Sequence, residues 1–228
     1  MNQIINKHLN KTALILGHGP SLDLIKKDLD LYKKNGIVLF GCNQWFSIYN
    51  TSPHYWVMAS NDDTILHYKN IVKNYDGFIF YADSVDLSDK NLVNQITTNY
   101  LTYDQRHFEG KRCDVCNWYH CDKFLNSKRL TIQEELQKYT KFETHYSPGS
   151  SVALHMLAFA VIMGCNPIYF TGLDLDYHKG YANNNAGLIN KVNINEFDIY
   201  RNEILQDLFI INESAKKIGI KLNLINFI

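Results

Sequence analysis

Residues 14–22, Leu-Ile-Leu-Gly-His-Gly-Pro-Ser-Leu, begin as an apolar run, stop at Gly17 and Gly19, and restart at Pro20 and Ser21. Aliphatic residues suit a buried strand, glycines suit a tight turn, and a proline beside a serine is typical of a helix start. Backbone N–H groups at such a turn can face an anion, which the glycines allow to approach closely. The stretch lacks the full G-x-G-x-x-G spacing and a Walker lysine. It therefore predicts a strand, a turn and a helix, with either a phosphate site or a plain connection at the turn.

The composition is that of a globular protein with a substantial core. The chain has 228 residues, 46% of them hydrophobic and 20% charged, and 23 basic residues balance 23 acidic ones. This balance gives no global attraction to nucleic acid or to an anionic membrane. Because no apolar run approaches the roughly 20 residues of a membrane span, and no signal-peptide pattern opens the chain, we expect a cytoplasmic protein. Cys42 and Cys165 lie beside predicted strands and are expected to be reduced core thiols.

Buried strands alternate with helices through most of the chain. Strands are predicted at 12–16, 36–41, 54–60, 77–81, 167–172 and 222–227, and helices at 21–34, 62–73, 152–163 and 195–218. The alternation is lost at residues 83–146, where one helix is expected at 131–139 within an insertion or lid. We predict an α/β fold, a single Rossmann-like domain over residues 1–228 with an open, mostly parallel sheet, helices on its faces and this insertion.

Polar residues follow several predicted strands. Asn43 follows the second strand and Asn61 the third, so both should meet the turn at Gly17 at the carboxyl edge of the sheet, where ligands bind in open parallel sheets. A second serine and glycine turn, residues 147–151, precedes the apolar helix at 152–163. Its hydroxyls and N–H groups suit a second phosphate contact. Alternatively, Ser150 or Ser151 only caps that helix.

Acidic residues at the same strand ends offer metal or proton chemistry. Asp174 and Asp176 follow one strand, and Asp62 and Asp63 follow another. Carboxylates at such positions can hold a divalent metal or act as a base. The structural alternative is that Asp174 ties its loop to backbone N–H groups.

Aromatic and histidine side chains come directly after the aspartates. The phenols of Tyr177 and Tyr181 can bind a phosphate without adding charge, and His178 can accept a proton from an attacking hydroxyl. An exposed loop histidine with no catalytic role is the alternative. Within the predicted insertion, four residues have the ligand types of a zinc site: Cys113, Cys116, His120 and Cys121. Alternatively, they are ordinary thiols and a histidine that bind no metal.

Three segments together resemble a known superfamily: residues 16–22 (Leu-Gly-His-Gly-Pro-Ser-Leu), residues 41–46 (Gly-Cys-Asn-Gln-Trp-Phe), and residues 149–177, which end in Thr-Gly-Leu-Asp-Leu-Asp-Tyr. One branch is the MptE-like family, which includes archaeal 6-hydroxymethyl-dihydropterin pyrophosphokinases and proteins from bacterial surface-polysaccharide loci. The other branch is the bacterial CMP-sialic-acid-dependent sialyltransferases. The resemblance covers roughly half of the chain.

The two branches imply different roles for the candidate residues. The sialyltransferase resemblance implies a nucleotide pocket, with Tyr177 and Tyr181 on the phosphate of the activated sugar. In this branch His18 stands where the family has asparagine, and the family's catalytic histidine has no counterpart after His178. The MptE-like resemblance implies that Asp62 and Asp174 hold magnesium on ATP. Together, the candidate nucleotide-binding residues are Gly17, His18, Gly19, Ser21, Asn43, Asn61, Ser147, Gly149, Ser150, Tyr177 and Tyr181, and the catalytic candidates are His178, Asp174 and Asp176.

We predict a nucleotide-dependent transferase. Glycosyl transfer from a CMP-type sugar in cell-surface glycan assembly is favoured over a magnesium- and ATP-dependent pyrophosphokinase, and a non-catalytic nucleotide or sugar-phosphate binder is the third hypothesis. The expected partners are a nucleotide or nucleotide sugar and a small-molecule or glycan acceptor, without nucleic acid. A homo-oligomer is compatible with the sequence.

Overall fold

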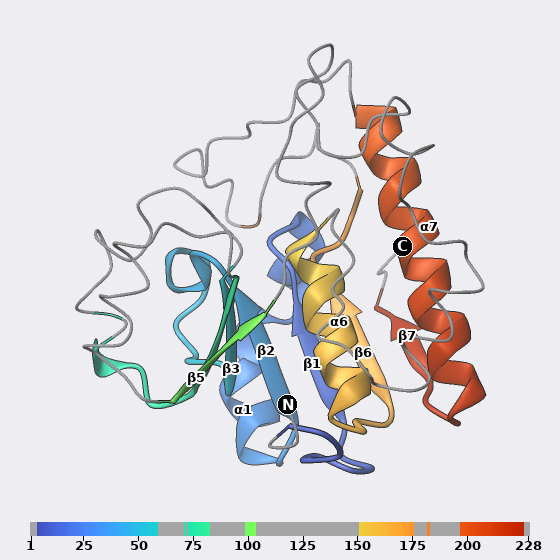
Figure 1. Ribbon diagram of the computed structural model, residues 1–228. Coiled ribbons are helices and arrows are strands. Elements are labelled where there is room, and N and C mark those ends of the chain that lie inside the picture. Colours follow the sequence, from blue (N-terminus) through green and yellow to red (C-terminus); the bar gives the residue numbers. More distant parts are fainter. Residues whose placement is uncertain are drawn as a thin grey trace.

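The computed structural model describes residues 4–58, 71, 73–82, 99–103, 151–175, 182 and 197–225. Their main feature is a seven-stranded sheet in the order β5-β4-β3-β2-β1-β6-β7 (Figure 1). Every strand pair is parallel, so the predicted α/β class is confirmed. The strands are β1 (Ala13–Leu16), β2 (Val38–Cys42), β3 (Tyr55–Met58), β4 (Phe78–Ala82), β5 (Tyr100–Tyr103), β6 (Ile168–Thr171) and β7 (Leu222–Leu224).

The strand order reverses between β1 and β6. Strands β1 to β5 pair in chain order, whereas β6 returns to the other side of β1 and β7 lies outside it. In doubly wound sheets, ligands bind at such a reversal, in the crevice outside the carboxyl ends of the strands. Leu16 pairs with Thr171 at the end of the β1–β6 ladder. The chain therefore leaves both central strands side by side, at Gly17 and Gly172.

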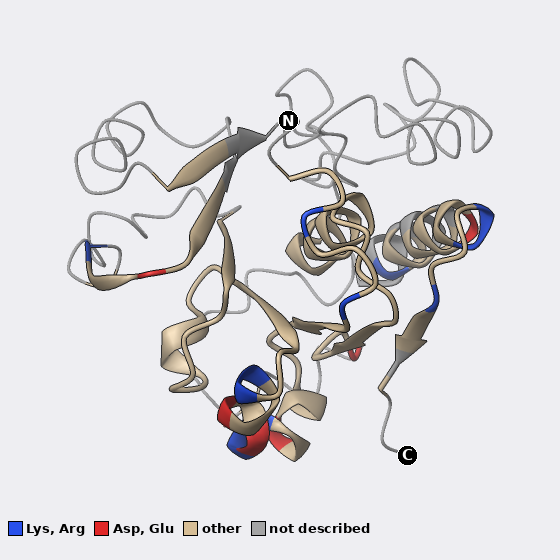
Figure 2. Ribbon diagram, turned by 90° about the horizontal axis from the view of Figure 1, so that it is seen from below, with Lys and Arg blue, Asp and Glu red and all other residues tan. Residues whose placement is uncertain are grey.

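Helices cover both faces of the sheet. The helical segments after β1 are η1 (Pro20–Leu24), η2 (Lys26–Asp28) and α1 (Leu29–Lys34), and η3 (Trp45–Ser47) follows β2. Helix α6 (Val152–Ile162) precedes β6, and α7 (Phe197–Lys217) connects β6 to β7. Figure 2 shows α6 and α7 together on one face and the η1–α1 segment on the other. The charged residues in this view gather on the η1–α1 segment and on α7, and none of the seven described strands carries one.

The core lies between α6 and the central strands. Every α6 residue after Val152 is buried, as expected for a helix that is apolar on nearly every side. Its Phe159 ring stacks on Phe80 of β4 at a centroid distance of 4.0 Å. Strands β1, β2 and β3 are buried along their whole length, as parallel strands covered on both faces should be. Cys42 and Cys165 are free, buried thiols, as predicted.

The segment before β1 packs on the C-terminal end of α6. Backbone N–H groups of residues 6, 8 and 10 donate to the carbonyls of residues 162, 163 and 164 at 3.0, 2.9 and 2.9 Å. These bonds satisfy carbonyls that have no partner within the helix. His8 also bonds through its Nε2 to the Tyr55 hydroxyl at 2.7 Å.

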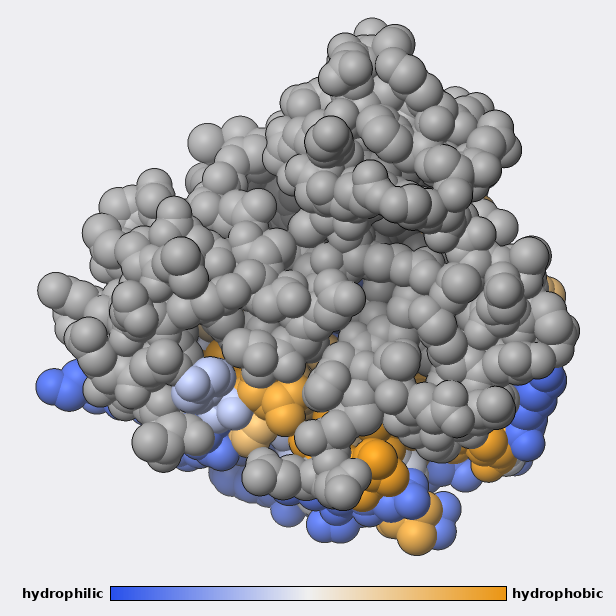
Figure 3. Space-filling model, in the orientation of Figure 1, coloured by the Kyte–Doolittle hydropathy of each residue, from blue (hydrophilic) through white to orange (hydrophobic). Residues whose placement is uncertain are grey.

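Some apolar side chains reach the surface. Hydrophobic patches lie beside hydrophilic ones on the lower part of the face drawn in Figure 3. Within the described part of the chain, no helix is long and apolar enough to cross a bilayer. The large exposed hydrophobic side chains include Leu9, Leu24, Leu31, Leu205, Phe209 and Ile218.

Two local predictions are wrong. Residues 21–34 do not form one helix, because η1 and η2 are 3₁₀ segments and only Leu29–Lys34 is α-helical. Apolar residues three or four apart suit both helix types, so their spacing cannot distinguish them. Secondly, residues 100–103 lie where the alternation was expected to be lost, yet they form β5 beside β4. The predicted helices at 152–163 and 195–218 are confirmed, whereas most of 62–73 and all of 131–139 lie outside the described residues.

Candidate functional site

The turns that follow β1 and β6 interlock through their backbones. Gly17 N–H donates to the Thr171 carbonyl at 2.9 Å, and Gly19 N–H donates to the Gly172 carbonyl at 2.8 Å. A Cβ on Gly17 would collide with the Gly172 carbonyl, and a Cβ on Gly172 would collide with the Gly17 carbonyl. Gly172 also has φ +72°, which disfavours any other residue. Packing of one turn on the other therefore explains why positions 17 and 172 are occupied by glycine.

Asp174 binds the start of η1. Its two carboxylate oxygens accept from the Ser21 N–H at 3.2 and 3.3 Å, and Oδ2 accepts from the Ser21 hydroxyl at 3.0 Å. A Cβ on Gly19 would collide with the same Oδ2. Gly19 is the residue before η1 and has no side chain to cap it. The Asp174 carboxylate, which comes from a different strand end, takes that place.

The Ser21 hydroxyl is at the centre of this contact. Besides donating to Asp174, its oxygen accepts from the Gly172 N–H at 2.8 Å and lies 3.1 Å from Thr171 Oγ1. A hydroxyl offers one donor and two acceptor positions. With Thr171 as a donor, all three positions of Ser21 are used. The serine thus fixes the β1 turn to the β6 turn by its side chain as well as through its backbone.

His18 joins the same turn to the end of β2. Its Nε2 lies 3.1 Å from the Cys42 carbonyl and 3.4 Å from Cys42 Sγ. Desolvation lowers the pKa of His18 to about 4, so the ring is neutral at pH 7. The bond to a carbonyl assigns the ring proton to Nε2. Burial also raises the pKa of Cys42 to about 12, so its thiol is a poor nucleophile at neutral pH.

Asn43 turns the chain away from the sheet after β2. It has φ 35°, a left-handed conformation that asparagine tolerates better than most residues. Its N–H donates to the Val57 carbonyl at 3.0 Å, and its carbonyl accepts from Trp56 Nε1 at 2.8 Å. Asn43 is therefore anchored to β3 by its backbone, and its side chain starts at the same sheet edge as His18.

The charges in the described part of this edge are few. Residues 17–21, 43–44 and 172–175 contain no lysine or arginine, and their one carboxylate is Asp174. No group of three or more His, Cys, Asp or Glu side chains that could hold a metal occurs among the described residues. Magnesium, however, is often bound by one or two carboxylates, with water and substrate phosphates as the other ligands. Asp174, partly exposed and held by Ser21, fits such a role because its oxygens have further lone pairs.

The structure thus brings together part of the predicted site. Gly17, His18, Gly19, Ser21, Asn43 and Asp174 all lie at the carboxyl ends of β1, β2 and β6. In the second predicted turn, Ser151 caps α6 by accepting from the Ala153 N–H at 3.3 Å. This agrees with the alternative interpretation of that turn, in which a serine caps the helix. The candidates outside the described residues are Asn61, Asp62, Asp63, Ser147, Gly149, Ser150, Asp176, Tyr177, His178 and Tyr181, together with Cys113, Cys116, His120 and Cys121.

Three contributors were absent from the sequence-based site. Cys42, Thr171 and Gly172 supply the backbone and hydroxyl groups that hold the turn. Their position in the sequence could have indicated this role, because each of the three is the last residue of a predicted strand or is adjacent to that last residue.

A model of the 6-hydroxymethylpterin diphosphokinase MptE-like family matches residues 1–180. The chain belongs to the MptE-like family. The match spans β1 to β6 and every described site residue, whereas α7 and β7 follow it. No curated protein and no solved structure is significantly similar to the chain. Membership in the MptE-like family suggests a nucleotide-using transferase, and the similarity to sialyltransferases stays a prediction.

Proposed function

We propose that this MptE-like protein is a magnesium-dependent diphosphokinase that binds ATP at the reversal between β1 and β6. The charge of the sheet edge carries the proposal. A triphosphate would meet the Asp174 carboxylate there, and no lysine or arginine in residues 17–21, 43–44 or 172–175. A divalent cation between carboxylate and phosphates removes this repulsion. Family membership and the strand order point to the same edge.

The residues of the edge would have separate tasks. Asp174, oriented by the Ser21 N–H and hydroxyl, would hold the cation. The bound cation would neutralise charge on the phosphates. Neutral His18 and Asn43 would contact the nucleotide without adding charge. The β6 turn occupies the space beside Gly17 and Gly19. The nucleotide would therefore lie on the outer side of this turn and not between the two glycines.

The reaction is transfer of a diphosphoryl group to an alcohol. The alcohol oxygen forms a bond to the β-phosphorus of ATP, the bond from that phosphorus to the α,β-bridging oxygen breaks, and AMP leaves. The alcohol proton passes to a base, for which Asp176 and His178 are the sequence-based candidates. Positioning and charge neutralisation provide most of the catalysis in phosphoryl transfer. Glycosyl transfer from a CMP-type sugar is the competing hypothesis, and it depends on Tyr177 and Tyr181.

Thermal unfolding in the presence of nucleotides tests the proposal. ATP with magnesium should stabilise the protein by about 2.7 kcal/mol at a hundredfold excess over Kd, and ATP with a chelator should do much less. Asp174→Asn, which keeps the size of the side chain, should remove the magnesium-dependent part. Asp23→Asn is the matched control, because Asp23 is an η1 carboxylate paired with Lys26 at the surface.

The alternatives give different results. Stabilisation by CMP without magnesium would overturn the diphosphokinase proposal in favour of glycosyl transfer. No response to ATP, AMP or CMP would contradict both enzyme hypotheses. An unchanged magnesium effect in Asp174→Asn would show that the cation is held elsewhere. Formation of AMP from ATP with an alcohol acceptor, followed by phosphorus NMR, would then establish the reaction.

A further inference from the structure

Helix α7 carries an apolar surface that the candidate site does not use. Leu205 is 43% exposed and Phe209 is 51% exposed. Beside them lies an open groove of about 300 Å³ between α7 and the end of the sheet. Its lining residues are Phe170, Leu205, Leu208, Phe209, Asn212 and Leu222. Both α7 and β7 follow residues 1–180, which the family model matches, so all of these lining residues except Phe170 lie outside the family match.

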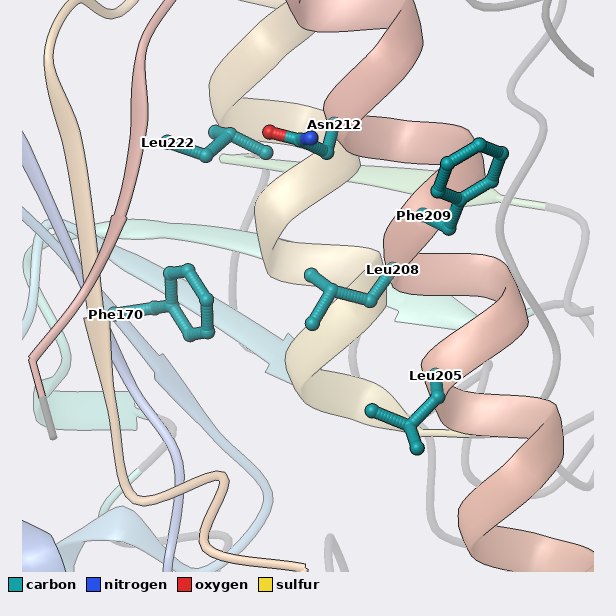
Figure 4. A pocket seen from close by; sticks show the side chains of 6 residues that line it. All are labelled: Phe170, Leu205, Leu208, Phe209, Asn212 and Leu222. Carbon is teal, nitrogen blue, oxygen red and sulfur yellow. The ribbon is translucent and has the colours of Figure 1, made fainter.

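Figure 4 shows how the groove is built. Leu208 and Asn212 point from α7 toward Phe170 and Leu222, Leu205 projects from the same side of the helix below them, and Phe209 points away from the sheet. The inner wall is thus formed by the sheet, and the rim is formed by two exposed apolar side chains. Partial exposure of apolar side chains of this size forfeits part of the free energy that their burial would contribute. An exposed apolar stripe beside a groove is typical of a protein contact surface.

The charges of the stripe indicate which partner fits. Arg201 and Lys216 are exposed and Glu213 is half-buried, and they flank the apolar pair on the same helix. Within the helix, Lys216 Nζ donates to Glu213 Oε1 at 2.7 Å, so Arg201 of a second copy would join an existing ion pair. Residues three, four and seven apart share one side of a helix, so Arg201, Leu205, Phe209 and Lys216 form one stripe.

An antiparallel copy of α7 that crosses at position 207 is complementary to this stripe. It brings Leu205 opposite Phe209 of the second copy, and Arg201 opposite Glu213 of the second copy. Because a two-fold axis repeats each pair, the contact has two apolar pairs and two opposite-charge pairs.

We propose that α7 is the dimerisation helix of this protein, and that it pairs with α7 of a second copy in antiparallel orientation. The apolar pair supplies the affinity, and the Arg201–Glu213 pairs set the register. The groove beside α7 gives room for apolar side chains of the second helix. The proposal does not depend on nucleotide binding, since α7 carries none of the described site residues.

The molar mass of the full chain in solution tests the dimer. Light scattering after size exclusion should give twice 26.5 kDa for the wild type. Phe209→Glu should weaken dimerisation by at least about a hundredfold, because it places a charge in the apolar pair. Leu31→Glu should remain dimeric, since Leu31 is 56% exposed but lies on α1, on the other face of the sheet. A monomeric wild type, or a dimeric Phe209→Glu, would overturn the proposal.

Charge reversal tests the register. Arg201→Glu alone brings two glutamates together at each end of the contact, and Glu213→Arg alone brings two arginines together, so each should be about tenfold weaker as a dimer. An equimolar mixture of the two variants restores both opposite-charge pairs and should form a heterodimer. A mixture that stays as weak as its components would refute the antiparallel arrangement.

Discussion

Acid should destabilise this protein through His18, because the folded turn holds its ring neutral. In the unfolded chain a histidine has a pKa near 6.5, whereas desolvation lowers that of folded His18 to about 4. The unfolded state therefore binds more protons than the folded state between these values. The stabilising contribution is present above pH 6.5 and is lost as the pH falls toward 4.

The size of the effect follows from the two pKa values. Between pH 7 and pH 5, protonation of the unfolded histidine lowers the free energy of unfolding by about 2 kcal/mol. His18→Asn removes the titrating group and keeps a polar side chain at this position. Between pH 7 and pH 5, the free energy of unfolding of the variant should therefore fall by about 2 kcal/mol less than that of the wild type. This difference does not depend on the stability of the variant at pH 7.

Urea unfolding at pH 7 and pH 5, with the m-value held constant, measures this difference. His8 lies at the opposite edge of the sheet, and desolvation lowers its pKa to about 4 as well. His8→Gln should therefore also reduce the loss of unfolding free energy between pH 7 and pH 5. Asn50→Gln, an exposed and non-titrating replacement, should leave the pH dependence unchanged. Equal losses in the wild type and His18→Asn would refute the lowered pKa of folded His18.

Two further predictions concern the interlocked turns. Ser21→Ala leaves the Gly172 N–H without its acceptor and removes the hydroxyl donor to Asp174, which keeps only the backbone N–H of residue 21. We expect a loss of about 1–3 kcal/mol in urea unfolding, compared with less than about 1 kcal/mol for Ser47→Ala, whose exposed hydroxyl donates to the Gln44 carbonyl. Gly172→Ala should cost more than Gly36→Ala, because both have positive φ but only Gly172 has backbone atoms where the Cβ would lie; the strain alone costs about 1–2 kcal/mol. Equal effects of the two glycine variants would argue against the interlock.

Strands β1 to β4 could be predicted from the sequence because each is a short, uninterrupted apolar or aromatic run. The sheet buries β1, β2 and β3 on both faces, so nothing polar interrupts them. Helix α6 was recognisable for the same reason. Strand β5 was not, since Tyr100–Tyr103 is a four-residue edge strand in a polar region, where short runs give little signal.

The candidate site could be located but not assembled from the sequence. Residues at strand ends mark the carboxyl edge, so Gly17, Asn43 and Asp174 could be named. The bond between Ser21 and Asp174 joins residues 153 positions apart, and no local pattern encodes a contact at that separation. For the same reason the cap of η1 could not be predicted from the sequence, because it is a side chain that belongs to the β6 turn.

These contacts change what the glycines of the first turn indicate. A G-x-G sequence suggests close approach of a phosphate to the backbone, but here Gly19 makes room for the Asp174 carboxylate and Gly17 for the Gly172 carbonyl. Replacing Gly19 by a larger residue would therefore disturb the fold and any ligand site together, and loss of binding in that variant would prove neither. Asp174→Asn separates the two effects, because it removes one negative charge and keeps the shape that Gly19 accommodates. The evidence for a nucleotide site thus depends on the strand reversal and on the charge at the sheet edge, and it is Asp174, not the glycines, that can be varied to test it.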